Sequence, residues 1–403
     1  MQTKISPEYN QSLSGQRAEE ILRSCVHCGF CTATCPTYQL LGDELDSPRG
    51  RIYLIKQLLE GNEVSQKTQQ HLDRCLVCRS CETTCPSGVD YSHLLEIGRH
   101  LVDQKVRRPL AVRLIRQLLR SLLPYPKRFS AAMALGRLFK PLLPKKLKQT
   151  IPDITGNTEW SKRSQKRKML ILNGCVQPSL SPSINAATSR VLGKLGIELI
   201  NKPLAQCCGA VNQHLDDEDT ASVFIKQNID QWWPLIESAE AEAIVITASG
   251  CGAMVKDYGY ILRHDAEYAD KARVISQHCK DLSEIIATED LSPLQITARQ
   301  TISFHSPCTL QHAQKINGVV EGILSRAGFT LNTISDGHLC CGSAGTYSIL
   351  QPAISQQLKA NKIKSLQENK PDLIATANIG CLHHLSSGTQ TAVKHWIELL
   401  DTN

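Results

Sequence analysis

Eight of the 17 cysteines fall in two stretches of twelve residues, CVHCGFCTATCP at 25–36 and CLVCRSCETTCP at 75–86. In each stretch, two residues separate the first cysteine from the second and the second from the third, three residues separate the third from the fourth, and a proline closes the run. Cysteine thiolates are soft ligands that suit zinc, copper(I) and iron-sulfur clusters. Structural zinc sites usually use two Cys-x2-Cys pairs, or cysteine with histidine. The longer run with its closing proline is instead typical of chains that hold two [4Fe-4S] clusters.

The doubled run also predicts which thiols share a cluster. In two-cluster ferredoxins, the fourth cysteine of each run ligates the cluster held by the other run. We therefore expect one [4Fe-4S] cluster to bind Cys25, Cys28, Cys31 and Cys85, and the other to bind Cys75, Cys78, Cys81 and Cys35. The alternative is a pair of zinc knuckles. Two cubane clusters with crossed ligands must lie close together, and such a pair is suited to passing single electrons.

The C-terminal half contains a second cysteine pattern, and this pattern occurs twice. A single cysteine is followed 32 residues later by Cys-Cys-Gly, and then by one more cysteine. The members are Cys175, Cys207, Cys208 and Cys251 in the first copy, and Cys308, Cys340, Cys341 and Cys381 in the second. We interpret each copy as a metal site that takes iron-sulfur or zinc. The alternative is a structural or free-thiol role, because buried cysteine often packs as a small apolar residue.

Helical segments are expected to position the first two runs. Between them, SPRGRIYLIKQLLEGN at 47–62 offers Ser47 as an N-cap, Pro48 at the first helical position and Gly61 as a stop. After the second run, SHLLEIGRHLVDQKV at 92–106 also shows helical periodicity. We expect His27 and Phe30, inside the first run, to pack against the first cluster.

Residues 166–403 differ in character from the N-terminal part. Short apolar runs that end in Gly-Cys or Pro-Cys alternate with helical stretches, which predicts parallel sheets with functional loops at the strand ends. The predicted fold is thus an all-helical ferredoxin domain with two [4Fe-4S] clusters, followed by two repeated α/β Cys-Cys-Gly domains. The predicted boundaries are 1–104 for the helical domain, 105–165 for a basic connector, 166–290 for the first repeat and 291–403 for the second.

The net charge of +7 comes from one segment of the chain. Residues 104–152 contain 13 Lys or Arg and no Asp or Glu. Within this segment Arg113, Arg116 and Arg120 recur at helical spacing among leucines. Such a helix suits an anionic membrane surface or an acidic partner, although an ordinary solvated helix face explains the pattern equally well. Interleaved aromatics and known binding modules are missing, so we expect no nucleic-acid partner.

Several classes of protein are not expected from this sequence. The N-terminal residues lack the basic start and apolar core of a signal peptide, and with so many thiols we expect a reducing, cytoplasmic compartment. No apolar run approaches the length of a membrane-spanning helix. We find no GxGxxG, P-loop, Ser-His-Asp or flavin-binding pattern, so we expect no catalytic residue for an organic substrate in this chain.

The helical two-cluster module followed by two Cys-Cys-Gly repeats resembles the iron-sulfur subunits of flavin-dependent hydroxyacid and glycerol-3-phosphate dehydrogenases, and the heterodisulfide reductase family. In length and layout the chain is most similar to the iron-sulfur subunits of bacterial glycolate oxidases. This resemblance implies an electron-transfer subunit of a hetero-oligomer, with FAD and the oxidation of glycolate to glyoxylate on partner subunits. It also implies a quinone or another electron acceptor, and peripheral contact with the inner membrane.

Each repeat departs from the full Cys-Cys-Gly pattern at one position. In full repeats the last cysteine belongs to a Cys-x-x-Cys pair, whereas here the positions read CGAM and CLHH, so Met254 and His384 replace the second thiolate. We therefore expect four-cysteine sites, with His305 or His384 as further candidate ligands, in place of five-thiolate clusters. Two alternative functions remain: direct reduction of a disulfide or acceptor by the repeats, and the same electron-transfer role in a lactate or glycerol-3-phosphate dehydrogenase complex.

Overall fold

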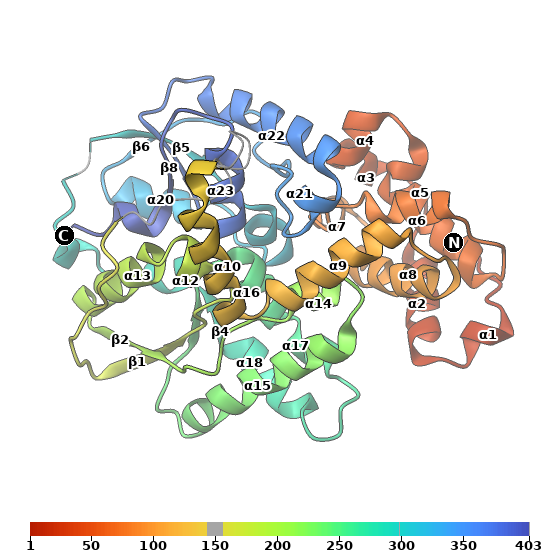
Figure 1. Cartoon of the computed structure of the whole chain (residues 1–403), viewed down its shortest axis with the longest axis horizontal. Coiled ribbons are helices and arrows are strands. Elements are labelled where there is room, and N and C mark those ends of the chain that lie inside the picture. The colour runs from red at the N-terminus through yellow and green to blue at the C-terminus, as the bar shows by residue number, and fades with distance from the viewer. Residues whose placement is uncertain (143–155, 298, 403) are drawn as a thin grey trace.

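The computed structural model describes residues 1–142, 156–297 and 299–402. The described N-terminal residues form helices and no strand, as predicted (Figure 1). The helix predicted between the two cysteine runs is α5 (Pro48–Leu59), and its N-terminus is capped because the Ser47 hydroxyl accepts a hydrogen bond from the Gly50 amide. The helix predicted after the second run is α8 (Tyr91–Lys105). The other elements of this module are α1 (Pro7–Asn10), α2 (Leu13–Ser24), α3 (Phe30–Ala33), α4 (Pro36–Leu41), η1 (Glu44–Asp46), α6 (Gln66–Asp73) and α7 (Ser80–Thr84).

The N-terminal module has a hydrophobic core of its own. Ile55 and Leu58 of α5, with Leu94 and Leu95 of α8, are completely buried in it. The two helices approach closely at Gly98, where an added Cβ would lie 2.6 Å from a side-chain carbon of Ile55. This close packing holds the loops that carry the two cysteine runs on one framework.

Each repeat contains a four-stranded parallel sheet, and the two sheets have the same topology, β2-β1-β3-β4 and β6-β5-β7-β8. The matching strand order confirms the predicted α/β repeat. The strands of the first sheet are β1 (Arg167–Ile171), β2 (Ile197–Asn201), β3 (Ile244–Ile246) and β4 (Cys279–Asp281). Those of the second are β5 (Thr301–His305), β6 (Thr330–Leu331), β7 (Leu373–Thr376) and β8 (Val393–His395).

Helices surround both sheets, and the two repeats share part of their core. The first repeat contains α12 (Gln177–Leu180), α13 (Ser183–Lys194), α14 (Ala210–His214), α15 (Glu218–Glu237), α16 (Ser249–Lys256), α17 (Tyr258–Ile261), α18 (Ala269–His278), α19 (Leu282–Ile286) and η3 (Ser292–Leu294). The second contains η4 (Thr309–Ala313), α20 (Val319–Arg326), α21 (Tyr347–Leu350), α22 (Pro352–Gln367), α23 (Ile379–Ser386) and η5 (Trp396–Leu399). The repeats are also joined by polar contacts, including a 2.7 Å hydrogen bond between the Ser249 and Thr309 hydroxyls.

The basic connector forms α9 (Leu110–Leu122), α10 (Pro126–Leu138) and η2 (Lys140–Leu142), and Figure 1 shows α9 and α10 crossing the molecule. Helix α9 packs against α14, and α10 packs against α12. Residues 143–152 of the basic segment lie outside the described residues. Among the described helices, none combines the length and apolarity that crossing a membrane requires.

The prediction that Arg113, Arg116 and Arg120 together form a contact surface needs correction. Arg116 is buried, with its guanidinium 3.5 Å from the Asp103 carboxylate, and Arg120 donates to the main-chain carbonyls of Leu215 and Asp216. Two of the three arginines therefore hold α9 against other parts of the same chain and do not face a partner. The outward face of α9 carries Leu110, Leu114 and Leu118 together with Arg113, because pairing with acidic and carbonyl groups draws the other two arginines inward.

A helix ends, or a strand begins, near each predicted domain boundary. Helix α8 ends at Lys105, β1 begins at Arg167 and β5 begins at Thr301. The division into four parts remains a prediction, because the core shared by the repeats crosses the boundary between them.

Candidate metal centres

The first thiol set lies around one small cavity in the N-terminal module. This cavity is lined by Cys25, Cys28, Cys31, Cys81 and Cys85. Burial raises the pKa of the Cys25 thiol, and the nearby Cys85 and Cys28 thiols raise it further by electrostatic repulsion. Burial likewise raises the pKa of Cys31 to about 11. Cys85, the last cysteine of the second run, therefore lies with the cysteines of the first.

The second thiol set is more deeply buried. Cys75, Cys78 and Cys81 are each 8% exposed, and Cys35 is 6% exposed. Burial raises the pKa of the Cys81 thiol, and the neighbouring Cys78, Cys75 and Cys35 thiols add to this rise. The fourth cysteine of the first run thus lies beside the second run, as the crossed assignment expects. The ligand assignment itself remains a prediction.

The backbone bends in the same way around both sets. His27 and Gly29 in the first run, and Val77 and Arg79 in the second, all have positive φ angles between 52° and 87°. Left-handed backbone is costly for a β-branched residue such as Val77 and is kept only where the surroundings demand it. Here it folds each loop so that consecutive cysteines point inward.

The donor atoms of both sets fit iron-sulfur clusters. Each predicted set consists of four thiols, and all described cysteines are free of disulfides. Bound [4Fe-4S] clusters supply one-electron transfer at these two positions. The raised thiol pKa values mean that binding a cluster releases protons, which couples cluster insertion to pH.

One expectation about the first run was wrong for Phe30 but not for His27. His27 and Phe30 were expected to pack against the first cluster. His27 does line the small cavity, although it is exposed on its outer side, whereas Phe30 is 60% exposed and does not line the cavity. Phe30 begins α3 and faces solvent, while the next residue, Cys31, lines the small cavity. The exposed ring leaves an apolar surface next to the first thiol set.

In the first repeat the predicted cysteines meet beyond the carboxyl ends of β1, β2 and β3. The thiols of Cys207 and Cys251 hydrogen-bond to Cys208 and hold its pKa well below its usual range. Cys175 hydrogen-bonds in turn to Cys207. Gly209 has a φ of +89°, the left-handed conformation that turns the chain after the vicinal pair. The result is four adjacent thiols, which form a suitable metal-ligand set.

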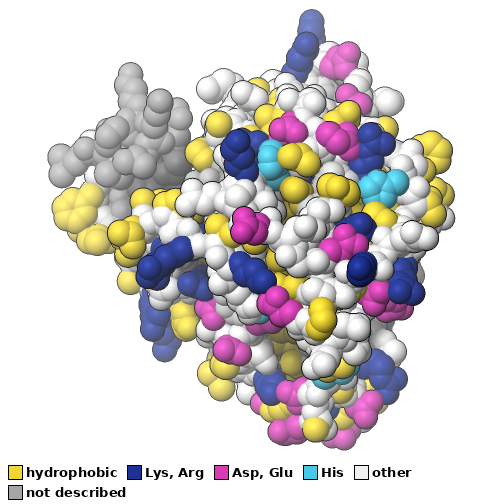
Figure 2. Space-filling view, turned by 90° about the vertical axis from the view of Figure 1, so that its right-hand side faces the viewer, with side chains coloured by type: hydrophobic (Ala, Val, Ile, Leu, Met, Phe, Trp, Pro, Cys, Tyr) yellow, Lys and Arg dark blue, Asp and Glu magenta, His cyan; other side chains and the backbone are white. Residues whose placement is uncertain are grey.

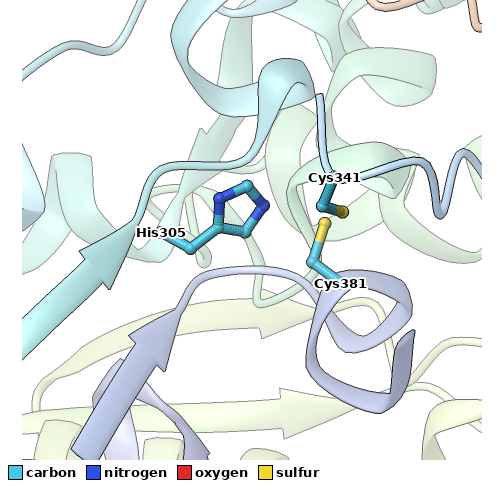
Figure 3. Close-up of side chains that lie close together, drawn as sticks. All are labelled: His305, Cys341 and Cys381. Atoms are coloured by element: carbon cyan, nitrogen blue, oxygen red, sulfur yellow. The ribbon is translucent and has the colours of Figure 1, made fainter. Parts of the chain in front are cut away.

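The second repeat has the same turn and the same order of thiol contacts, from Cys308 through Cys340 and Cys341 to Cys381. The Cys308 and Cys340 sulfurs lie 3.7 Å apart. Cys341 contacts both Cys340 and Cys381, and the sulfurs of Cys341 and Cys381 lie close to the His305 ring (Figure 3). Gly342 has a φ of +87°, and a Cβ there would lie 2.6 Å from the Ser355 carbonyl oxygen, so only glycine fits.

The two residues that replace the last thiolate have different surroundings. Met254 is buried in the apolar core of the first repeat. His384 is also buried, its Nε2 lies 3.3 Å from the Ser355 hydroxyl, and burial lowers its pKa to about 4. His384 is therefore neutral near pH 7.

A cavity of about 800 Å3 brings the second thiol set and both repeats together. It is lined by Cys75, Cys175, Cys207, Cys208, Cys251, Cys308, Cys340 and Cys381. The module is fastened to the second repeat at this place, where the Tyr347 hydroxyl donates to the Arg74 carbonyl and Thr83 bonds to His312. Burial raises the pKa of Cys78, and the nearby Cys308 thiol raises it further. Sequence reasoning missed this convergence, because no local pattern connects the cysteine runs with the repeats.

Comparisons with known proteins agree with this arrangement. Residues 21–89 match the 4Fe-4S dicluster domain family, and residues 169–256 and 302–386 each match the cysteine-rich domain family. The first match spans both cysteine runs and supports iron-sulfur clusters there.

Full-length relatives extend the comparison. The glycolate oxidase iron-sulfur subunit of Escherichia coli is 55% identical over 402 residues, which cover 100% of this chain and 98% of that protein. A probable glycolate oxidase iron-sulfur subunit of Bacillus subtilis is 29% identical over 92% of this chain and 89% of that protein. Lactate utilization protein A of Bacillus cytotoxicus is 26% identical and matches only 58% of this chain. With paired cysteine runs, duplicated cysteine-rich repeats and this full-length identity, the chain belongs to the family of glycolate oxidase iron-sulfur subunits.

Proposed function

We propose that this chain carries electrons to a quinone by way of its two cysteine runs. The electrons come from a flavoprotein partner that oxidises glycolate. The observation that carries the proposal is the spatial order of the thiol sets. The first set reaches the surface at the exposed Cys28, the second is buried, and Cys75 of the second set lines the large cavity. A series of redox centres that begins at the surface and ends at a cavity suits transfer between two different partners.

Electrons enter, in this proposal, at the surface around the first set. Val26 and Phe30 are 66% and 60% exposed beside the exposed Cys28. The face on this side of the molecule has positive and negative side chains interspersed, without a large area of one sign (Figure 2). Exposed apolar side chains next to a redox centre suit a protein interface, so we place the flavoprotein here.

Electrons leave, in this proposal, through the large cavity. Its walls include apolar side chains such as Leu76, Val77, Val112, Met254 and Ile349, alongside the thiols. An apolar cavity with a few polar groups is the usual form of a site for an organic ligand. The flat, weakly polar ring of a quinone fits this chemistry.

The connector supplies a route to the membrane in which quinones dissolve. Leu110, Leu114 and Leu118 of α9 are 73%, 70% and 60% exposed, and Ile115 of the same helix lines the large cavity. In α10, Leu135 and Leu138 are also exposed. An exposed apolar helix face suits shallow insertion into one leaflet. We therefore propose peripheral contact with the inner membrane through this surface.

The proposal can be tested with the anaerobically purified complex of this chain and its flavoprotein partners. Rapid mixing with glycolate should first reduce the flavin and then bleach the iron-sulfur absorbance of this chain. Replacing Phe30 by Glu should slow the second phase about tenfold or more, because a charge at the contact costs at least about 1.4 kcal/mol. Leu13→Glu is the matched control, since Leu13 is 59% exposed in the same module.

Three results would contradict the proposal. Bleaching by lactate or glycerol 3-phosphate but not by glycolate would assign another substrate to the partners. Equal slowing by Phe30→Glu and Leu13→Glu would remove the entry surface. Full bleaching without reduction of an added short-chain quinone would remove the proposed acceptor.

A further inference from the structure

Arg51 is a charged side chain buried completely in the N-terminal module, and the electron path proposed above gives it no role. Its guanidinium is 0% exposed and lies 3.3 Å from the Asp46 carboxylate. The same carboxylate also pairs with Arg74 at 2.8 Å, so these three side chains together carry a net positive charge. A buried charge is costly unless groups of opposite sign compensate it. The excess positive charge therefore calls for a further anion nearby.

The second thiol set lies close to this positive charge. Both terminal nitrogens of Arg51 donate at 3.2 Å to the Thr37 hydroxyl, and that hydroxyl lies 3.3 Å from the Cys35 sulfur. Burial lowers the pKa of the Arg51 guanidinium, but the negative charges of Cys75, Tyr91 and Cys35 raise it above its ordinary value. Arg51 thus acts on the second set from within the core, with the Thr37 hydroxyl between its guanidinium and Cys35.

Tyr91 gives the same set a hydrogen bond. It begins α8, is 4% exposed, and its hydroxyl donates to the Cys75 sulfur at 3.6 Å. The Tyr91 side chain also lines the small cavity of the first set, so it lies where the two sets adjoin. In the described part of the module, both side-chain hydroxyls that contact a cysteine sulfur, those of Tyr91 and Thr37, belong to the second set.

The first set has a more weakly acting charge beside it. Arg49 lines its cavity, but the Arg49 side chain is 37% exposed and pairs with Glu44. Water and this carboxylate screen the charge of Arg49. The deeper burial of the second set favours the less negative, oxidised form of a cluster and so lowers its reduction potential. Buried positive charge and hydrogen bonds to the sulfurs act in the opposite direction.

We propose that Tyr91 and Arg51 raise the reduction potential of the cluster at Cys75, so that it accepts an electron from the cluster near the surface. An added electron makes a cluster more negative, and a buried positive charge and an O–H donor both stabilise the more negative form. The two residues act through the sulfur ligands and do not bind iron. This inference deepens the proposed electron path and rests on it for the direction of flow, whereas the potential is a property of this chain alone.

An EPR-monitored redox titration of the anaerobically purified full chain, with dithionite and mediators, tests the inference without glycolate, flavoprotein or quinone. Tyr91→Phe removes the hydroxyl and keeps the ring. It should shift electron exchange between the two clusters about tenfold towards the first, which corresponds to a potential about 59 mV lower at Cys75. The other cluster should keep its potential. Cys78→Ser identifies which signal belongs to the cluster at Cys75.

Tyr347→Phe is the matched control. Burial raises the pKa of Tyr347, and the nearby Cys75 thiol raises it further, but the Tyr347 hydroxyl donates at 2.9 Å to the Arg74 carbonyl and not to a sulfur. The potential should therefore stay unchanged in this variant. Arg51→Gln should lower the potential at least as far as Tyr91→Phe. Iron content shows whether each variant holds its clusters, and Tyr91→Phe decides the question if Arg51→Gln does not.

Three results would overturn the inference. The first is an unchanged potential in Tyr91→Phe with full iron content. The second is an equal shift in Tyr347→Phe, and the third is an equal shift of both clusters, because each of these would show a general change in the module. If the potentials shift as expected but glycolate fails to bleach the wild-type complex, the proposed electron path fails while the assignment of Tyr91 and Arg51 holds.

Discussion

Replacing the exposed leucines of α9 tests how the chain meets a membrane. Fully burying a leucine side chain contributes about 1.5–3 kcal/mol. Leu114 and Leu118 are 70% and 60% exposed, so insertion into lipid gains about 1–2 kcal/mol from each. Changing both to Ser should therefore weaken membrane binding by about 2–4 kcal/mol, or roughly 30- to 700-fold.

The assay is flotation of the anaerobic complex with vesicles, with and without anionic lipid. Arg113→Ser is the matched control, because Arg113 is exposed on the same helix. It should lower binding only to anionic vesicles and by about 1 kcal/mol. Arg116 is not a suitable control, because its buried guanidinium pairs with Asp103 and its loss would disturb the seating of α9.

Two outcomes would refute this reasoning. If the leucine variant binds vesicles as tightly as the wild type, α9 does not insert. If the variant stays on vesicles but loses its flavoprotein partners, the exposed face of α9 is a subunit interface, and the partners carry the membrane contact.

Three further predictions concern the N-terminal module and its contact with the first repeat. Cys35→Ser should alter the EPR signal of the cluster at Cys75 and spare the other cluster; a change confined to the first run's cluster would contradict the crossed ligands. Asp46→Asn should lower the free energy of unfolding of the module by about 3–5 kcal/mol in urea titrations, because it leaves the fully buried Arg51 without its carboxylate partner. The hydrogen bond with Asp216 raises the pKa of His100 above 6.5, so its stabilisation is fully present below pH 6.5 and disappears as pH rises through the raised pKa. His100→Gln should remove that pH dependence. The change in the free energy of unfolding should be less than about 1 kcal/mol, because the pair is partly exposed, and an unchanged pH profile of unfolding would disprove the assignment.

Local sequence patterns were sufficient to predict the helices and strands and the type of metal ligand. The cap at Ser47, the helix α5 and the alternation of strands and helices each depend on residues close together in the chain, so their spacing predicts them directly. The cysteine runs behave in the same way, because a few consecutive residues determine how each loop can surround a cluster. The two-fold repetition of the Cys-Cys-Gly pattern likewise predicted two sheets of equal topology.

The prediction failed where a side chain's role depends on distant residues. The spacing of Arg113, Arg116 and Arg120 describes one helix face but does not say which groups will lie opposite it. Arg120 meets carbonyls of residues 215 and 216, which are 95 and 96 positions away in the chain. Pairing with such groups turns Arg116 and Arg120 inward, and leaves Arg113 and the leucines exposed.

The sequence alone thus determined the chemistry of this protein: thiol ligands in two runs, two cysteine-rich repeats and the helices and strands that carry them. Tertiary structure decided which of these groups meet. Packing between the module and the repeats placed Cys75 in one cavity with thiols from both repeats, and the pairing of β5 with β7 brought His305 to Cys341 and Cys381. The physical reason is that short-range geometry follows from covalent spacing, whereas contacts between distant segments follow from the burial of surfaces that no local pattern encodes.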